Sequence, residues 1–152
     1  DPADIVVILD ADHADDPTLL HRLTDPIVAD DADFVLADRT RSAEPGALQP
    51  QQRIGNWLAT RLMAMATGHR YRDMGPFRAM RFSAMTALQM EDPTWGWNVE
   101  MQMKAIQHGL RVLEIPMPYR KRRAGRSKIS GTVRGTVKAG VRILWAVNHY
   151  KR

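Results

Sequence analysis

An unbroken apolar run near the start of the chain limits the fold more than any other sequence feature. Residues 5–9 read Ile-Val-Val-Ile-Leu and lead directly into Asp10-Ala11-Asp12. A run that is apolar at every position and mostly β-branched is typical of a strand buried on both faces, as in a parallel sheet covered by helices. The two aspartates then follow the carboxyl end of the strand, which is where open α/β sheets bind ligands.

The chemistry of these two aspartates favours a hard divalent cation. Carboxylate oxygens suit Mg²⁺ or Mn²⁺, which usually bind substrate phosphates as well as protein groups. The alternative is that the acids only cap the next helix. The following Asp15-Asp16-Pro17 already has the pattern of an N-cap with proline in the first turn. Asp10 and Asp12 are therefore left as candidate metal ligands.

The pattern after this corner predicts alternating helices and strands. Apolar residues recur at helical spacing over residues 17–29, and a second short apolar strand covers residues 33–37. We therefore expect a parallel strand–helix–strand unit with a right-handed crossover. Further helices are expected over residues 51–67, 97–108 and 130–150, and further strands over residues 77–82 and 110–119. The fold class is α/β, with a mostly parallel sheet flanked by helices.

Composition narrows the class of protein. The 152 residues suffice for one domain, and 44% hydrophobic with 26% charged residues is ordinary for a globular chain. No stretch approaches the roughly 18 consecutive apolar residues of a membrane span. Without cysteine there are no disulfides or thiolate metal sites, and the start of the chain has no signal-peptide pattern. We expect a cytoplasmic protein.

Charge is unevenly distributed along the chain. Residues 1–33 hold ten acids against one base, whereas residues 111–152 hold twelve Lys or Arg against one acid. Such a basic region predicts an anionic partner, which can be a phosphate, a nucleic acid or an anionic membrane surface at the inner face of the membrane. The basic stretch lacks the interleaved aromatic residues on which bases stack, so no nucleic-acid partner is expected.

Two segments are candidates for contact with that partner. The aperiodic loop over residues 38–50 carries Arg39 and Arg41 and is either a mobile acceptor-site loop or a plain surface excursion. The glycine-hinged stretch with Arg126, Ser127 and Lys128 could bind a diphosphate or remain a solvated basic face. The helices over residues 51–67 and 130–150 are amphipathic with basic residues, so each either packs on the domain or lies on anionic lipid.

Several short motifs, taken together, resemble the family 2 glycosyltransferases, and most closely their dolichyl-phosphate mannose synthase-like branch. The resemblance covers nearly the whole chain. The motifs, in chain order, are Leu9-Asp10-Ala11-Asp12 with Asp15-Asp16-Pro17, Asp73-Met74-Gly75-Pro76-Phe77-Arg78-Ala79, Trp97-Asn98-Val99-Glu100-Met101-Gln102, Glu114-Ile115-Pro116 with Tyr119-Arg120, and Gly125-Arg126-Ser127-Lys128. Each motif is weak alone, but their order and spacing are specific.

The resemblance implies a GT-A fold and transfer of a sugar from a nucleotide-diphospho-sugar, such as UDP-glucose or GDP-mannose, with inversion. The acceptor would be a polyprenyl phosphate or a hydroxyl group. Asp10 and Asp12 then hold Mg²⁺ or Mn²⁺ against the donor diphosphate, and Glu100 is the general base.

The resemblance assigns the other candidates as well. Asp73 and Arg78 line the sugar and acceptor region, with Asp73 a second candidate catalytic residue. Arg78, together with Arg126, Ser127 and Lys128, is assigned to donor phosphate binding. A polyprenyl phosphate acceptor is already an anion and needs no base.

The chain departs from the family pattern at its start. The family's Pro-x-x-Asn-Glu segment and the second acidic strand end that grips the nucleoside are missing from these residues. We therefore expect residues 1–129 to be the C-terminal portion of a GT-A domain, followed by a basic helix at 130–152, and we expect the isolated chain to bind donor poorly. The rival hypotheses are a module that binds anionic membranes or nucleic acid, and a non-catalytic scaffold.

Overall fold

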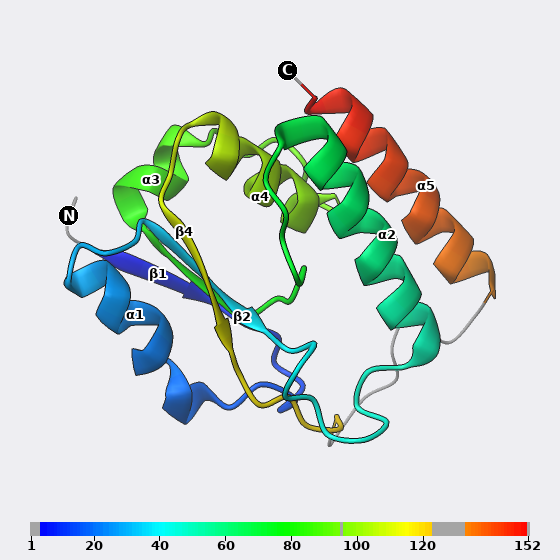
Figure 1. Cartoon of the computed structure of the whole chain (residues 1–152), viewed down its shortest axis with the longest axis horizontal. Coiled ribbons are helices and arrows are strands. Elements are labelled where there is room, and N and C mark those ends of the chain that lie inside the picture. Colours follow the sequence, from blue (N-terminus) through cyan, green and yellow to red (C-terminus); the bar gives the residue numbers. More distant parts are fainter. Residues whose placement is uncertain (1–3, 95, 123–132, 152) are drawn as a thin grey trace.

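The computed structural model describes residues 4–94, 96–122 and 133–151, with the side chains of the last helix described from residue 140. Its elements, in chain order, are β1 (Ile5–Ile8), a 3₁₀ helix (Pro17–Leu19), α1 (His21–Val28), β2 (Phe34–Asp38), α2 (Pro50–Thr67), β3 (Arg78–Arg81), α3 (Phe82–Ala87), α4 (Trp97–Gln107), β4 (Val112–Pro116) and α5 (Val133–His149). The expected α/β alternation is confirmed, and Figure 1 shows helices on both sides of a central sheet. Arg126, Ser127 and Lys128 lie outside the described residues.

The sheet has the strand order β1-β3-β2-β4 and is mixed rather than mostly parallel in its pairings. β2 pairs with β4 in parallel, but β3 pairs antiparallel with both β1 and β2. The predicted strand–helix–strand unit exists, and its two strands run in the same direction. They are not neighbours, because β3 returns to the sheet between them. Three of the four strands share one direction, as expected, and β3 is the exception.

Two-sided burial belongs to β2 and not to β1, contrary to the sequence prediction. All four residues of β1 are only half-buried, because β1 is an outer strand of the described sheet. Every residue of β2 is buried. Phe34 and Leu36 contribute to a core with α2, α4 and α5, whereas Val35 and Ala37 pack with α1 on the opposite face. Because successive side chains of β2 point to opposite faces of the sheet, this one strand contributes to two separate cores.

Helix α5 packs into the larger of these cores. Ala146, Val147 and Tyr150 are buried there beside Met63 of α2 and Met101 of α4. Figure 1 shows α5 alongside α2. In the part of the chain that the structure describes, no helix combines the length and the hydrophobicity that crossing a bilayer requires.

Gly75 marks a close passage between the end of β2 and the segment that leads into β3. A Cβ atom added at Gly75 would lie 2.9 Å from Arg39 Nε and 3.2 Å from both the Ala37 carbonyl oxygen and Asp73 Oδ2. These neighbours are held in place by other contacts, since Ala37 N donates a hydrogen bond to the Phe77 carbonyl at 2.9 Å. Only a residue without a side chain fits here.

We expect Gly75→Ala to lower the free energy of unfolding by about 1–3 kcal/mol, the usual cost of overpacking a tight site. Urea denaturation measures this change. Gly55→Ala in α2 is the matched control, because a Cβ there meets nothing within 4 Å. That control should stabilise the helix by roughly 0.5–1 kcal/mol. Equal effects of the two substitutions would contradict the close passage.

Candidate functional site

The turn after β1 gathers four aspartates, but only Asp16 acts as the predicted helix cap. Asp16 Oδ1 accepts hydrogen bonds from Thr18 N at 3.1 Å and from Thr18 Oγ1 at 2.7 Å, and Pro17 opens the 3₁₀ helix. Asp12 Oδ1 accepts from Ala14 N at 3.0 Å, which shapes the turn itself. Asp10 is exposed. The capping role therefore leaves Asp10, Asp15 and one oxygen of Asp12 available for other contacts.

Asp15 is the group that sequence reasoning missed, because it was read only as part of the cap. Its side chain is almost fully buried, and neither carboxylate oxygen has a hydrogen-bond partner among the described residues. Burial raises the pKa of Asp15 to about 6, against the lowering effect of Arg39. The negative charges of Asp10, Asp12 and Asp73 raise it further. Four carboxylates therefore act on one small region, which we call the acidic corner: Asp10, Asp12, Asp15 and Asp73.

The segment that follows β4 lies against this acidic corner. Arg120 N donates to the Ala14 carbonyl at 2.8 Å, and the Arg120 guanidinium pairs with Asp16 at 2.8 Å. Arg122 Nε lies 2.6 Å from Asp12 Oδ2, in an ion pair whose angle does not make it an aligned hydrogen bond. The basic segment after β4, which begins at Arg120, thus starts beside the carboxylates.

Asp73 is buried and serves as an anchor. Its carboxylate accepts hydrogen bonds from Arg39 N, Nε and Nη2 at 2.9, 2.7 and 2.9 Å, and from Met74 N at 2.8 Å. The Arg39 guanidinium also lies over the Tyr119 ring at 4.9 Å. The paired geometry of a guanidinium on a carboxylate fixes both side chains. Asp73 therefore joins the loop after β2 to the segment before β3.

Side chains from three other elements hold the backbone around Asp73. Glu114 of β4 accepts hydrogen bonds from Arg72 N at 2.8 Å and from Asp73 N at 3.1 Å, and burial raises the pKa of this carboxyl. Asn56 of α2 donates to the Arg72 carbonyl and accepts from Met74 N. Gln102 of α4 donates to the Asp73 carbonyl at 3.0 Å. The segment is thus fixed from the sheet and from both helices.

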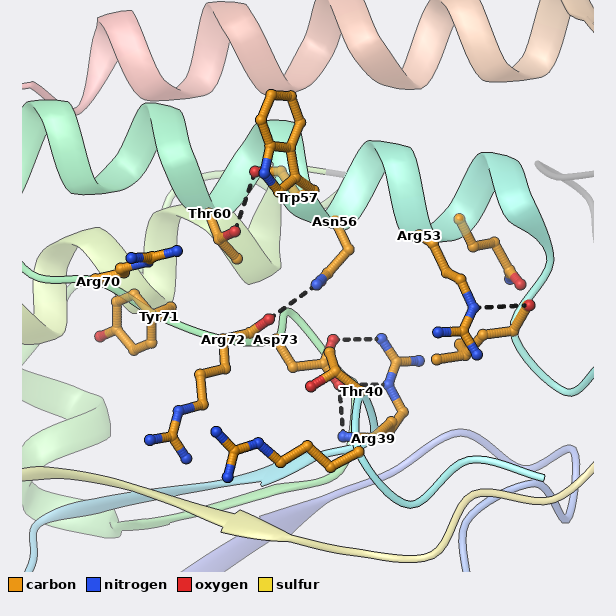
Figure 2. A pocket seen from close by; sticks show the side chains of 13 residues that line it. Arg39, Thr40, Arg53, Asn56, Trp57, Thr60, Arg70, Tyr71, Arg72 and Asp73 are labelled. Atoms are coloured by element: carbon orange, nitrogen blue, oxygen red, sulfur yellow. Dashed lines mark hydrogen bonds and ion pairs between the residues drawn. The ribbon is translucent and has the colours of Figure 1, made fainter. Parts of the chain in front are cut away.

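A pocket of about 650 Å³ opens between this segment and α2. Figure 2 shows Arg53, Asn56 and Thr60 reaching from α2 toward the segment that carries Asp73. The charged side chains that line it are five arginines and one aspartate: Arg39, Arg41, Arg53, Arg70, Arg72 and Asp73. Of these arginines, only Arg39 has an ion-pair partner, which is Asp73. The other four form no ion pair with any residue that the structure describes. We call this cavity the arginine pocket.

The arginine pocket includes Arg39 and Arg41, which the sequence predicted for an acceptor loop. It also contains Arg53, Arg70 and Arg72, which sequence reasoning did not select. These arginines come from α2 and from the stretch before β3, so their spacing along the chain gives no signal of a common site. Guanidinium groups around one cavity fit an anion such as a phosphate group, which they can bind bidentately.

Two predicted site residues lie elsewhere. Arg78 is completely buried, with its guanidinium on the Gly75 carbonyl and 3.7 Å from Met101 Sδ, and burial lowers its pKa to about 10. Glu100 is also completely buried. Its carboxylate accepts from Glu91 N at 2.7 Å and Asp92 N at 2.8 Å and pairs with Lys104 at 2.7 Å. Neither residue lines the arginine pocket.

The raised pKa of Asp15 predicts a dependence of stability on pH. Because the folded-state pKa of about 6 exceeds the ordinary pKa of 3.8 for an aspartic acid, the stability that this group contributes is fully present below pH 4. It is lost as pH rises through 6. Asp15→Asn cannot ionise. We expect the variant to exceed the natural chain in unfolding free energy by about 1–2 kcal/mol at pH 7.5 and to match it near pH 4.

Urea denaturation from pH 4 to 7.5 in a metal chelator measures this difference. The exposed Asp31→Asn is the control for the loss of one acid at the surface. A difference between Asp15→Asn and the natural chain that stays constant over this range would contradict a raised pKa of the buried Asp15.

Comparison with known proteins identifies the family. The family described as Glycosyl transferase family 2 matches residues 2–88, more than half of the chain. The glycosyltransferase AglJ of Haloferax volcanii is 27% identical over 124 residues, which cover 81% of this chain and 41% of that protein.

Two further relatives agree with this match. An undecaprenyl-phosphate mannosyltransferase of Micrococcus luteus is 27% identical over 145 residues, covering 87% of this chain and 56% of the relative. An uncharacterized glycosyltransferase of Mycobacterium tuberculosis is 35% identical over 75 residues, covering 48% of this chain and 34% of the relative. The chain spans about half or less of the length of these relatives. By its family match, the chain belongs to glycosyl transferase family 2.

Proposed function

We propose that the chain carries the acceptor side and the diphosphate-binding side of an enzyme that transfers a sugar from a nucleotide-diphospho-sugar to a polyprenyl phosphate. The observation that carries the proposal is the arginine pocket, which shares the Arg39–Asp73 pair with the acidic corner. Four arginines without a carboxylate partner suit the phosphate of an acceptor. The name of one relative, an undecaprenyl-phosphate mannosyltransferase, agrees with that acceptor class.

The acidic corner supports a divalent cation in this proposal. Asp15 has unpartnered carboxylate oxygens, and the donor set of aspartates is the chemistry that Mg²⁺ and Mn²⁺ prefer. No group of three or more acidic or histidine side chains within the described residues forms a complete metal cage. Magnesium usually needs only one or two carboxylates when substrate phosphates complete its coordination. Asp10 and Asp12 are the proposed ligands, and the ion would offset the charge of the nucleoside diphosphate as it leaves.

The protein's own groups would then position two anions. Arg53, Arg70 and Arg72 bind the acceptor phosphate, and the buried Arg39 is held by Asp73 as part of the wall. The acceptor oxygen attacks the anomeric carbon as the bond to the diphosphate breaks, in a single displacement that inverts that carbon. A phosphate acceptor is already an anion, so no general base is required. The buried contacts of Glu100 suit a structural role in such a reaction.

A lipid-linked acceptor also accounts for the outer surface of α2. One side of the helix bears four exposed apolar residues: Ile54, Trp57, Leu58 and Met65. The exposed Arg61 lies on the same side. Figure 2 shows the Trp57 ring pointing away from the segment that carries Asp73, although Trp57 also contributes to the pocket lining. The neighbouring α5 exposes Val141, Leu144 and Trp145. An apolar surface with basic residues beside a phosphate pocket suits contact with an anionic membrane.

Loss of Arg53 should impair use of the acceptor. In the full-length protein, we expect Arg53→Gln to lower kcat/KM for a polyprenyl phosphate about 10–100-fold, because a charge-assisted hydrogen bond contributes about 1.5–3 kcal/mol. Transfer of labelled sugar to undecaprenyl phosphate measures this. Arg61→Gln removes the same charge from a position of α2 that does not line the pocket, and should change the rate less than twofold. If neither substitution affects transfer, the pocket is not the acceptor site.

If the phosphate binds but Asp12→Asn leaves turnover unchanged, the proposed role of Asp12 as a metal ligand is wrong.

Contact with lipid can be tested separately from transfer. We expect Ile54→Ser with Met65→Ser to weaken binding to phosphatidylglycerol vesicles several-fold, because about 25 cal/mol is lost for each Å² of apolar surface no longer buried in the membrane. Vesicle co-sedimentation measures the binding. The control is Val28→Ser, which removes an exposed apolar side chain from α1 across the sheet. Equal binding by the double variant and the control would exclude the surface of α2 as a lipid contact.

A further inference from the structure

Arg122 holds the one oxygen of Asp12 that the turn itself does not use. Asp12 Oδ1 accepts from Ala14 N at 3.0 Å, which leaves Oδ2 for an outside group. Arg122 Nε lies 2.6 Å from that oxygen. The Arg122 side chain is 33% exposed, whereas Asp12 Oδ2 itself is buried, so a cation can reach that oxygen only if Arg122 moves aside. The contact joins the start of the basic segment after β4 to the proposed metal ligand.

A divalent ion and this guanidinium cannot share Asp12 Oδ2. Both are cations, and Arg122 already occupies the approach to this buried oxygen at 2.6 Å, so steric overlap and like-charge repulsion make the two compete for it. The neighbouring Arg120 differs in this respect. It pairs with Asp16 at 2.8 Å, and Asp16 is occupied as the cap of the 3₁₀ helix.

We propose that Arg122 is an exchangeable counter-ion of Asp12, which a divalent cation displaces and which then binds the diphosphate of the donor. This inference rests on the proposed function and adds an order of events to it. The guanidinium neutralises Asp12 until the cation binds. Once displaced, it is a planar, permanently charged group next to the cation, with donors that match phosphate oxygens bidentately. The carboxylate and the diphosphate would thus compete for one arginine.

The exchange predicts a gain of metal affinity when the arginine is removed. In the full chain, we expect Arg122→Gln to bind Mn²⁺ about fivefold more tightly, the change that corresponds to a partly exposed ion pair at the upper end of its usual range. Electron paramagnetic resonance of free Mn²⁺ measures this without any turnover. Arg120→Gln is the matched control, with the same change of charge on the same segment, and should differ from the natural chain by less than twofold.

The proposed contact of Arg122 with the diphosphate predicts the opposite effect of the substitution when a diphosphate is present. For the manganese–pyrophosphate complex, we expect Arg122→Gln to bind about fivefold more weakly than the natural chain, because the displaced guanidinium is missing. Arg122→Lys, which keeps a charge but not the planar fork, should fall between the two in both measurements. Thermal unfolding of each variant shows that the fold is retained.

Each failure has its own meaning. If Arg122→Gln and Arg120→Gln shift the Mn²⁺ affinity equally, or Arg122→Gln leaves it unchanged or weaker, the exchange is wrong while the metal site stands. If the natural chain and every variant fail to bind Mn²⁺ at millimolar concentration, the metal site of the proposed function is wrong, and the exchange is wrong with it.

Discussion

The pairing of Arg39 with Asp73 is the interaction on which the rest of the site depends. It ties the loop that leaves β2 to the segment that enters β3, and Gly75 permits this approach because it has no side chain. Both groups are largely buried, so loss of either would leave an unpaired charge in the interior, which is strongly destabilising. Both residues line the pocket, and Asp73 also belongs to the acidic corner. The pair therefore connects the two regions.

Several elements support that contact, and they place the arginine pocket where the chain has no local motif. Glu114, Asn56 and Gln102 hold the backbone next to Asp73, and they come from β4, α2 and α4. Each satisfies backbone groups that would otherwise be buried without a partner, which is costly. The pocket is in this way bounded by a rigid wall, although its arginines other than Arg39 have no ion pair among the described residues.

Local patterns in the sequence predicted the elements well, because helical periodicity and short apolar runs are short-range signals. They did not predict that β3 would insert between β1 and β2, since strand order is decided by long-range packing. For the same reason the apolar run of β1 was interpreted as a central strand. The turn acids were recognised, but the pocket was only half found. Arg53 and Arg72 become neighbours only through tertiary contacts.

Helix α2 faces two environments. Some of its side chains line the arginine pocket, and exposed apolar side chains face away from it. An α-helix turns by about 100° per residue. Inserting one residue ahead of Ile54 would therefore rotate every later position and exchange polar for apolar groups over the pocket. The hydrogen bonds of Asn56 with the Arg72 carbonyl and the Met74 amide fix the rotation of the helix about its axis. Length variation among related chains should for this reason fall in the loop before α2 and not within it.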